Sequence, residues 1–104
     1  MKNFLFICGK NKLRSPTAEA IFNEYANISA RSAGINSDAE YIVTGEDIEW
    51  ATHIFLMEKS QRTKLFNKYK NLIKDQKVIV LNIPDKYKYM DPELVQILKM
   101  NVIV

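Results

Sequence analysis

A short apolar run that ends directly in a polar loop constrains the fold of this chain more than any other feature. The run covers residues 4–7 (FLFI) and is followed by the sequence CGKNKLRSP at residues 8–16. A short continuous apolar run bounded by turn-forming residues is typical of a buried strand. Ser15-Pro16 is typical of a helix start with proline in the first turn. The sequence therefore predicts a strand, a tight loop and a helix in direct succession.

The predicted loop has the features of an anion-binding site. In such a loop the backbone N–H groups converge with those of the first helical turn, at the positive end of the helix dipole. Cys8 and Arg14 lie at the two ends of the loop. Helix N-termini and neighbouring cations favour the thiolate of a cysteine, and an arginine guanidinium matches two phosphoryl oxygens better than lysine does. Alone, Cys8 could be a small buried apolar residue, but the arginine, serine and proline after it favour a nucleophile.

At these residues the chain resembles the low-molecular-weight protein tyrosine phosphatases, in particular their short bacterial branch. The family signature is a cysteine, five residues, an arginine and a serine near the N-terminus, which residues 8–15 match. The resemblance continues in the family's order through Thr17-Ala18-Glu19-Ala20-Ile21-Phe22, Ser32-Ala33-Gly34, Ile54-Phe55-Leu56-Met57-Glu58 and Asp91-Pro92.

The resemblance implies a role for individual residues. Cys8 would attack phosphorus, Arg14 would bind the phosphoryl oxygens, and Asp91 would be the general acid. Asn11 and Ser15 would hold the loop and its thiolate. The phosphate-binding loop implied in this way comprises Gly9, Lys10, Asn11, Lys12, Leu13, Arg14 and Ser15.

The loop departs from the family pattern at two positions. Lys10 stands where the family usually has glycine, and Leu13 stands where a second cysteine is frequent. An oxidised Cys8 therefore has no neighbouring thiol with which to form a reversible disulfide. Lys10 and Lys12 either raise the local potential for anionic substrates or are simply solvated.

The candidates outside the loop each have an alternative interpretation. Asp91 before Pro92 is also a good helix N-cap. Asp85 follows another proline in the same segment and is the reserve candidate for the acid. Tyr87 and Tyr89 could wall a slot for a phenyl ring, or they could pack in the interior.

The rest of the chain alternates strand-like and helix-like segments, which favours a parallel sheet with helices on both faces. We expect strands near 3–7, 29–33, 53–57 and 78–82, and helices near 16–26, 46–51, 59–74 and 92–100. The predicted fold is a single three-layer α/β domain over residues 1–104, with a four-stranded parallel sheet in the order 2-1-3-4. In that order a switch point lies beside the end of the first strand, where ligands bind in open sheets.

Composition and charge narrow the class of protein. The 104 residues are 47% apolar and 26% charged, as in an ordinary small globular domain. A net charge of +3 is modest for a nucleic-acid-binding protein, and no apolar run approaches a membrane span. The one cysteine suits the reducing cytoplasm, and the one histidine, His53, has no partners for a metal site. We expect a cytoplasmic protein without a metal or other cofactor that binds neither nucleic acid nor membranes.

Together these features predict a protein tyrosine phosphatase, a phosphoric monoester hydrolase. It would act on a phosphotyrosine-containing protein or a small aryl phosphate through a cysteinyl-phosphate intermediate. Two alternatives remain: a phosphate- or phosphotyrosine-binding module without turnover, and a cysteine phosphocarrier, which would need neither Arg14 nor Asp91. An arsenate reductase would need additional cysteines, which the sequence lacks.

Overall fold

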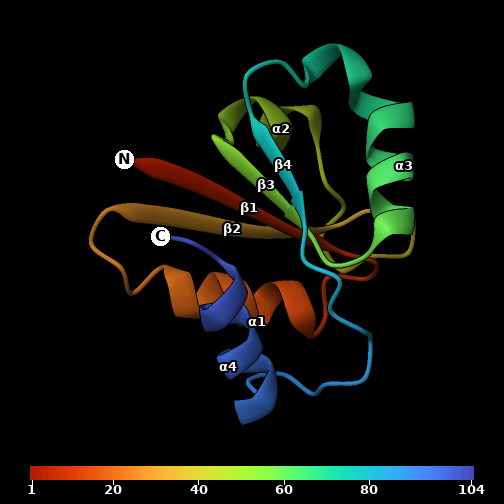
Figure 1. Ribbon diagram of the computed structural model, residues 1–104. Helices are drawn as coiled ribbons and strands as arrows, with labels where there is room; N and C mark the ends of the chain where they lie inside the picture. The colour runs from red at the N-terminus through yellow and green to blue at the C-terminus, as the bar shows by residue number, and fades with distance from the viewer.

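Four strands form one parallel sheet in the order β2-β1-β3-β4 (Figure 1). The computed structural model describes all residues from 1 to 104. The strands are β1 (Lys2–Cys8), β2 (Ile28–Gly34), β3 (His53–Leu56) and β4 (Lys77–Val80). The predicted strand order and direction are confirmed, and each strand begins and ends within two residues of its predicted range.

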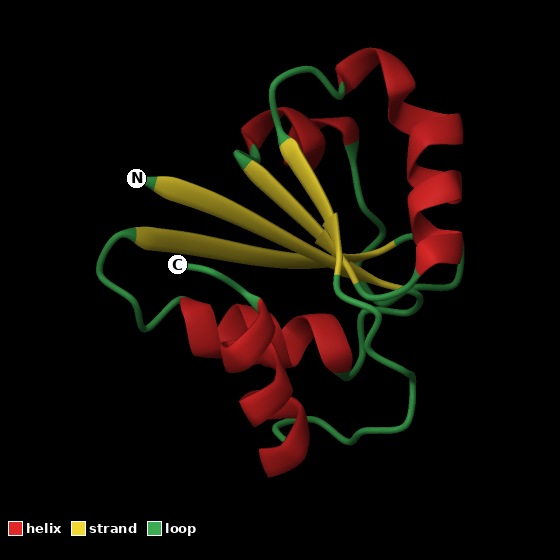
Figure 2. Ribbon diagram, in the orientation of Figure 1, coloured by secondary structure: helices red, strands yellow, loops and turns green.

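Helices cover both faces of the sheet, as predicted (Figure 2). Side chains of β1 alternate between the two faces: Phe4 and Phe6 belong to one buried cluster, Leu5 and Ile7 to the other. The first cluster is covered by α1 (Arg14–Phe22) and α4 (Pro92–Asn101), and the second by α2 (Gly45–Trp50) and α3 (Lys59–Tyr69), which continues into the 3-10 turn η1 (Lys70–Leu72).

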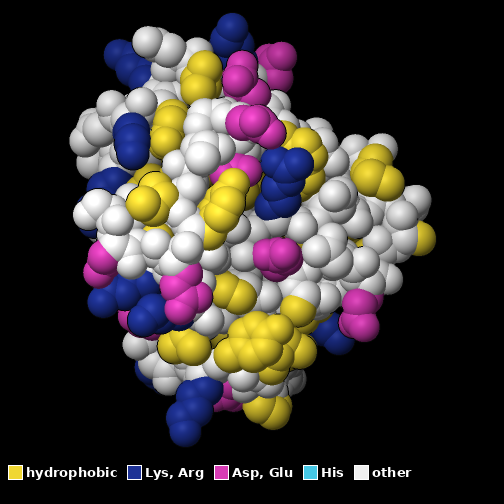
Figure 3. All heavy atoms as spheres, turned by 180° about the vertical axis from the view of Figure 1, so that it is seen from behind, with side chains coloured by type: hydrophobic (Ala, Val, Ile, Leu, Met, Phe, Trp, Pro, Cys, Tyr) yellow, Lys and Arg dark blue, Asp and Glu magenta, His cyan; other side chains and the backbone are white.

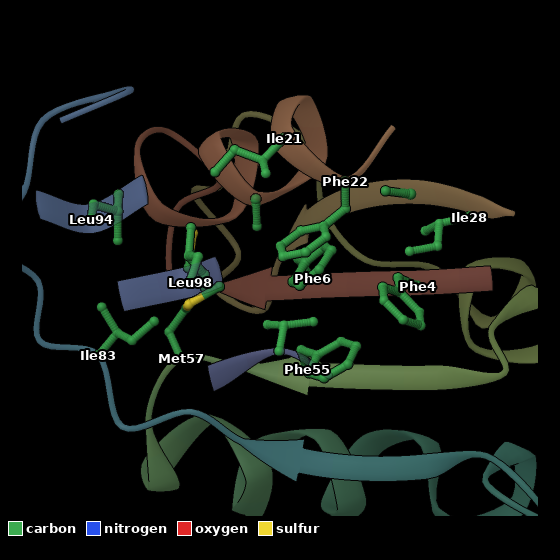
Figure 4. Packing of buried hydrophobic residues seen from close by; sticks show 14 of the residues in the cluster. Phe4, Phe6, Ile21, Phe22, Ile28, Phe55, Met57, Ile83, Leu94 and Leu98 are labelled. Carbon is green, nitrogen blue, oxygen red and sulfur yellow. The ribbon is translucent and has the colours of Figure 1, made fainter. Parts of the chain in front are cut away.

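Aromatic rings fill the layer between the sheet and α1 (Figure 4). The ring of Phe6 stacks on Phe22 of α1 and on Phe55 of β3, with centroid distances of 5.4 and 5.0 Å. All three side chains are buried, and Leu94 and Leu98 of α4 pack on the same cluster. Truncating a buried phenylalanine to alanine typically lowers the free energy of unfolding by about 3–5 kcal/mol. The cluster therefore fixes β1 against α1, and with it the two ends of the loop that joins them.

Two helices are shorter than predicted. α1 ends at Phe22 because the side chain of Asn23 turns the chain toward β2: its Nδ2 donates to the Ala30 carbonyl at 3.0 Å, and its Oδ1 accepts from the Ala30 N–H at 2.7 Å. α3 changes to a 3-10 turn whose last carbonyl, that of Leu72, accepts from Gln76 Nε2 at 3.0 Å. The end of α1 and the end of the η1 turn therefore involve side chains beyond the helical residues.

The surface seen from behind mixes positive and negative side chains, while hydrophobic side chains gather toward the end formed by α1 and α4 (Figure 3). Tyr25, which follows α1, and Met100 of α4 are among the exposed large hydrophobic residues. No helix combines the length and the apolar character needed to cross a lipid bilayer.

Candidate active site

The predicted phosphate loop lies at the carboxyl edge of the sheet, together with the first turns of α1 and α3 (Figure 1). Cys8 is the last residue of β1, and Arg14 is the first residue of α1. Because β1 lies between β2 and β3, this is the switch point that the strand order predicts.

The Cys8 thiol is held by contacts from its own loop. Its Sγ lies 2.9 Å from Ser15 Oγ and accepts from the backbone N–H of Asn11 at 3.2 Å. Asn11 Nδ2 donates to Ser15 Oγ at 3.0 Å, and Ser15 Oγ also lies 3.4 Å from the Ala33 carbonyl oxygen, to which it can donate. All three residues are buried. The Asn11 N–H and the Ser15 hydroxyl therefore fix the position of the sulfur at the centre of the loop.

Asn11 gives the loop its curvature. Its φ of 57° lies in the left-handed region. Asparagine adopts this conformation more readily than most residues, because its short side chain can hydrogen-bond locally. Here that side chain bonds Ser15, so one residue both turns the loop and supports the thiol.

The segment after β2 supports the loop from outside. Residues 35–40 donate three backbone hydrogen bonds, each of 3.0 Å, to the carbonyl oxygens of Cys8, Gly9 and Lys10. Gly34 permits this close approach, because a Cβ there would lie 2.7 Å from the Gly9 oxygen. In a trans peptide the carbonyl and the following N–H point in opposite directions. These bonds therefore turn the next N–H groups toward the inside of the loop.

Six backbone N–H groups of the loop donate no hydrogen bond within the protein; they belong to Gly9, Lys10, Lys12, Leu13, Arg14 and Ser15. The last two lie in the first turn of α1, at the positive end of its dipole. Native proteins pair nearly all such groups with protein, water or ligand. Unpaired donors at a helix N-terminus are the usual site for a phosphate.

The Arg14 guanidinium is buried, with 4% of the side chain exposed. Its Nη1 donates to Glu58 Oε2 at 2.7 Å and to the Ile83 carbonyl at 2.8 Å, and its Nε lies 3.7 Å from Asp85 Oδ1. Gln61 Nε2 also donates to Glu58 Oε2, at 3.3 Å. Nη2 has no acceptor within the protein and is free to bind a phosphoryl oxygen.

These groups line a hollow of about 260 Å³. Its wall consists of Cys8, Gly9, Lys10, Lys12, Leu13, Arg14, Asn36, Glu58, Ser60, Gln61, Lys64 and Asp85, of which two are hydrophobic and none is aromatic. Four cationic side chains face two carboxylates, which suits a small anion. No cluster of three or more His, Cys, Asp or Glu side chains is arranged to hold a metal ion.

The predicted loop residues fall into two groups. Five of the seven, together with Cys8, line the hollow. The other two, Asn11 and Ser15, are buried behind the thiol and contact it or each other. The structure thus brings the whole predicted loop around Cys8.

Asp91, the expected general acid, does not line the hollow, whereas the reserve candidate Asp85 does. Asp91 is the N-cap of α4: its Oδ1 accepts from the Glu93 N–H at 2.9 Å. The preceding N–H, that of Met90, donates to Thr17 Oγ1 of α1 at 3.0 Å, which ties this part of the chain to α1. Asp85 comes much sooner after the end of β4 and so stays at the carboxyl edge of the sheet.

Neither predicted wall tyrosine lines the hollow. Tyr87 is buried in the cluster between the sheet, α1 and α4, whereas Tyr89 is 53% exposed. Ile83 belongs to the same buried cluster. Asp85 therefore lies between two buried residues that fix its segment. Tyr87 packs in the interior, which is the alternative interpretation given for it above.

Sequence reasoning did not identify five residues of the wall: Asn36, Glu58, Ser60, Gln61 and Lys64. A signal for Glu58 was present, because it follows β3 closely and polar residues after parallel strands meet at one edge. Lys64 had no such signal. Its place depends on how α3 packs, through the buried Leu65, on the sheet.

An open parallel sheet with a cysteine-centred phosphate loop at its switch point defines a class of proteins that handle phosphoryl groups through a thiol. Within that class, the chain belongs to the low molecular weight phosphotyrosine protein phosphatase family, whose model matches residues 3–81. The resemblance expected from the sequence is confirmed. No curated protein gives a significant match.

Solved bacterial structures share the fold. SP-PTP, a low molecular weight protein tyrosine phosphatase from Streptococcus pyogenes, has a TM-score of 0.78 at 17% identity, covering 97% of this chain and 88% of its own. The arginine phosphatase YwlE from Geobacillus stearothermophilus has a TM-score of 0.77 at 21% identity, covering 95% and 89%. The Escherichia coli K30 tyrosine phosphatase Wzb, in complex with phosphate, has a TM-score of 0.76 at 17% identity, covering 96% and 92%. At these identities the similarity shows the fold alone.

Proposed function

We propose that this chain is a protein tyrosine phosphatase that hydrolyses phosphotyrosine through a cysteinyl-phosphate intermediate. One observation carries the proposal: the buried Cys8 thiol accepts a hydrogen bond from the Asn11 N–H and contacts Ser15 Oγ, inside a loop whose other backbone N–H groups lack acceptors. A cysteine that only packs needs no such surroundings. Phosphoryl transfer depends mainly on positioning and on fixed donors around the three equatorial oxygens.

In the first step the Cys8 thiolate attacks phosphorus and forms an S–P bond while the bond from phosphorus to the tyrosine oxygen breaks. The loop N–H groups and Arg14 bind the three equatorial oxygens. We assign Asp85 as the acid that protonates the leaving phenolate. Its place in the wall, 3.7 Å from Arg14 Nε, supports this assignment over Asp91.

In the second step water attacks the phosphorus of the intermediate. Asp85, now a carboxylate, takes a proton from the water, the S–P bond breaks, and inorganic phosphate and the Cys8 thiolate are released. One carboxyl group can serve both steps, because giving up its proton in the first step leaves the carboxylate that the second step requires. With 67% of its side chain exposed, Asp85 is accessible to solvent water.

Phosphoarginine is a second candidate substrate, favoured by the chemistry of the wall. No aromatic side chain is present to stack on a phenyl ring, whereas Glu58 and Asp85 could accept hydrogen bonds from a guanidinium. YwlE, whose structure is similar, is an arginine phosphatase. The proposed partner is a phosphorylated protein or, as the alternative, a small aryl phosphate. We place its action in the cytoplasm, where a thiolate stays reduced.

The proposal is tested by single-turnover and steady-state hydrolysis of an aryl phosphate and of phosphoarginine, comparing the wild type with Cys8→Ser. We expect the wild type to release the leaving group in a burst ahead of phosphate. We expect Cys8→Ser to show no turnover above background, because a serine hydroxyl is a much weaker nucleophile than a thiolate. Circular dichroism and thermal unfolding establish that the variant is folded.

The outcomes distinguish a phosphatase from a phosphocarrier and from a binding module. A burst with either compound supports catalysis through Cys8, and the compound with the higher kcat/KM is the preferred substrate. Phosphorylation of Cys8 without release of phosphate would indicate a phosphocarrier. Phosphate binding by the wild type with neither phosphocysteine nor turnover would contradict catalysis and leave a binding module.

A further inference from the structure

The mouth of the hollow carries three lysines, Lys10, Lys12 and Lys64, here called the lysine rim. They come from two elements, since Lys10 and Lys12 belong to the loop after β1 and Lys64 belongs to α3. All three are exposed. Three exposed lysines from two separate parts of the chain therefore line one hollow.

These charges are not neutralised by strong ion pairs. Lys10 Nζ lies 3.6 Å from Asp38 Oδ2, with both side chains more than half exposed, so the pair is weak. Lys64 Nζ donates to Asn36 Oδ1 at 3.2 Å, and an amide oxygen carries no charge. Lys12 forms no ion pair.

The phosphoryl group does not require the lysine rim for its own binding. The loop supplies unpaired backbone N–H groups, and Arg14 supplies a buried guanidinium with a free Nη2. Of the two carboxylates in the wall, Glu58 already pairs with Arg14. The rim therefore adds positive charge beyond the donors that bind the phosphoryl group, and this charge lies where the rest of a substrate would leave the hollow.

We propose that the lysine rim binds acidic side chains that flank the phosphorylated residue of a protein substrate. This inference rests on the proposed function and names its substrate class. Neighbouring residues of an extended peptide lie about 3.3–3.8 Å apart along the chain, so side chains one or two positions from the phosphorylated residue lie at the mouth. Exposed ion pairs are weak and screened by salt, so the rim selects among substrates rather than holding them tightly.

The test compares kcat/KM for two phosphotyrosine peptides that differ only in their flanks, acidic in one and neutral in the other. We expect the wild type to prefer the acidic peptide by about fivefold or more at low salt, since each exposed pair is worth about 1.5- to 5-fold. The preference should shrink when salt is raised from about 0.02 M to about 0.5 M. The ratio of the two kcat/KM values cancels effects on the chemistry that both peptides share.

Substitutions of single lysines test whether the preference for the acidic peptide comes from the lysine rim. Lys12→Gln and Lys64→Gln should each lower the ratio by about 1.5- to 5-fold, and Lys64→Glu should lower it further. Lys68→Gln is the matched control, because Lys68 lies on the same helix and is exposed but lies outside the hollow. Its ratio should equal that of the wild type.

A wild-type ratio of kcat/KM near one would contradict the proposed role of the lysine rim. A fall of this ratio in Lys68→Gln as large as in the rim variants would also contradict it, because net charge alone would then explain the preference. A small aryl phosphate separates this failure from failure of the proposed function, because it has no flanks. If the wild type hydrolyses none of the three compounds, the proposed function fails. The ratio of the two peptides' Kd values, measured by calorimetry on the wild type, then decides whether the rim binds acidic flanks.

Discussion

Arg14 is oriented before any ligand arrives. A buried guanidinium needs hydrogen-bond partners for its donors, and here Glu58 and the Ile83 carbonyl both engage Nη1. One nitrogen is thereby fixed while the other terminal nitrogen stays free. Lysine at position 14 could not divide its donors in this way, because it has a single charged nitrogen on a flexible stem.

The two aspartates of the segment after β4 allow the assignment of the acid to be tested. Asp85→Asn should lower kcat for an aryl phosphate by roughly 10²–10⁴, the usual contribution of a general acid. Asp91→Asn should leave kcat close to the wild-type value, because Asp91 caps α4 and asparagine is an equally good cap. Steady-state kinetics of the two variants measures this difference.

The reverse pattern, with Asp91→Asn inactive and Asp85→Asn active, would restore the assignment implied by the family resemblance. A substrate with a very acidic leaving phenol is the internal control. It needs little protonation, so Asp85→Asn should lose less activity with it than with a poor leaving group.

At the scale of single residues, the sequence predicted the part of the candidate site that lies within one loop. Cys8, Asn11, Arg14 and Ser15 lie within one loop, so their spacing alone placed them together. The proposed acid, Asp85, is far along the chain from this loop, and the sequence offered two aspartates beside prolines for the role. What separates them is the bond from Met90 to Thr17 on α1, a contact across 73 positions that no spacing rule encodes.

Among the elements, β2 does more than extend the sheet. Its last residue, Gly34, leads into the segment that bonds the carbonyl oxygens of the phosphate loop. The same segment contributes Asn36 to the wall of the hollow. The end of β2 therefore sets both the shape of the loop and part of the mouth.

Gly34→Ala should disturb both stability and activity. The added Cβ would lie 2.4 Å from Ala39 Cβ and 2.7 Å from the Gly9 oxygen, so backbone must move. Overpacking of this kind typically lowers the free energy of unfolding by about 1–3 kcal/mol. We expect kcat/KM to fall as well, because the Gly9 peptide is part of the loop. Urea unfolding and steady-state kinetics measure the two effects.

Gly45→Ala is the matched control for this substitution. Its Cβ would meet the tip of the flexible Leu72 side chain at 2.9 Å, far from the loop, and alanine is favoured over glycine in a helix. A loss of activity equal to that of Gly34→Ala would contradict the role given to the end of β2.

Element positions were predictable where periodicity decides them. The continuous apolar run of residues 4–7 predicts a buried strand, which the two clusters on its faces confirm, and alternating strands and helices predict a parallel sheet. The ends of α1 and α3 were not predictable in the same way. α1 ends where the side chain of Asn23 bonds the backbone of Ala30, and the 3-10 turn that follows α3 ends at Leu72, whose carbonyl accepts from Gln76.

On the scale of the whole molecule, the amino edge of the sheet carries a pH-sensitive group. His53 begins β3, and burial, followed by the charges of Lys77 and Lys2, lowers its pKa below the ordinary 6.5. Between the lowered pKa and 6.5 the unfolded chain binds a proton that the folded chain does not. The free energy of unfolding should therefore fall as pH drops below 6.5, by at most about 1.4 kcal/mol per pH unit.

Well above pH 6.5 His53 is neutral in both states and should contribute no slope. Urea unfolding at a series of pH values, comparing the wild type with His53→Gln, isolates the contribution, since the other titrating groups are common to both proteins. An unchanged slope in His53→Gln below pH 6.5 would show that His53 is protonated equally in the folded and unfolded states.

The bond from Arg14 to the carbonyl of Ile83 joins positions 69 residues apart. During synthesis, the cysteine loop leaves the ribosome long before the residues that orient its arginine and, on our assignment, supply its acid. The parallel sheet delays assembly further, because β1 cannot complete its pairing until β3 has been made. A nascent chain is therefore expected to carry Cys8, the proposed nucleophile, without an oriented Arg14 until Ile83 and Asp85 have left the ribosome.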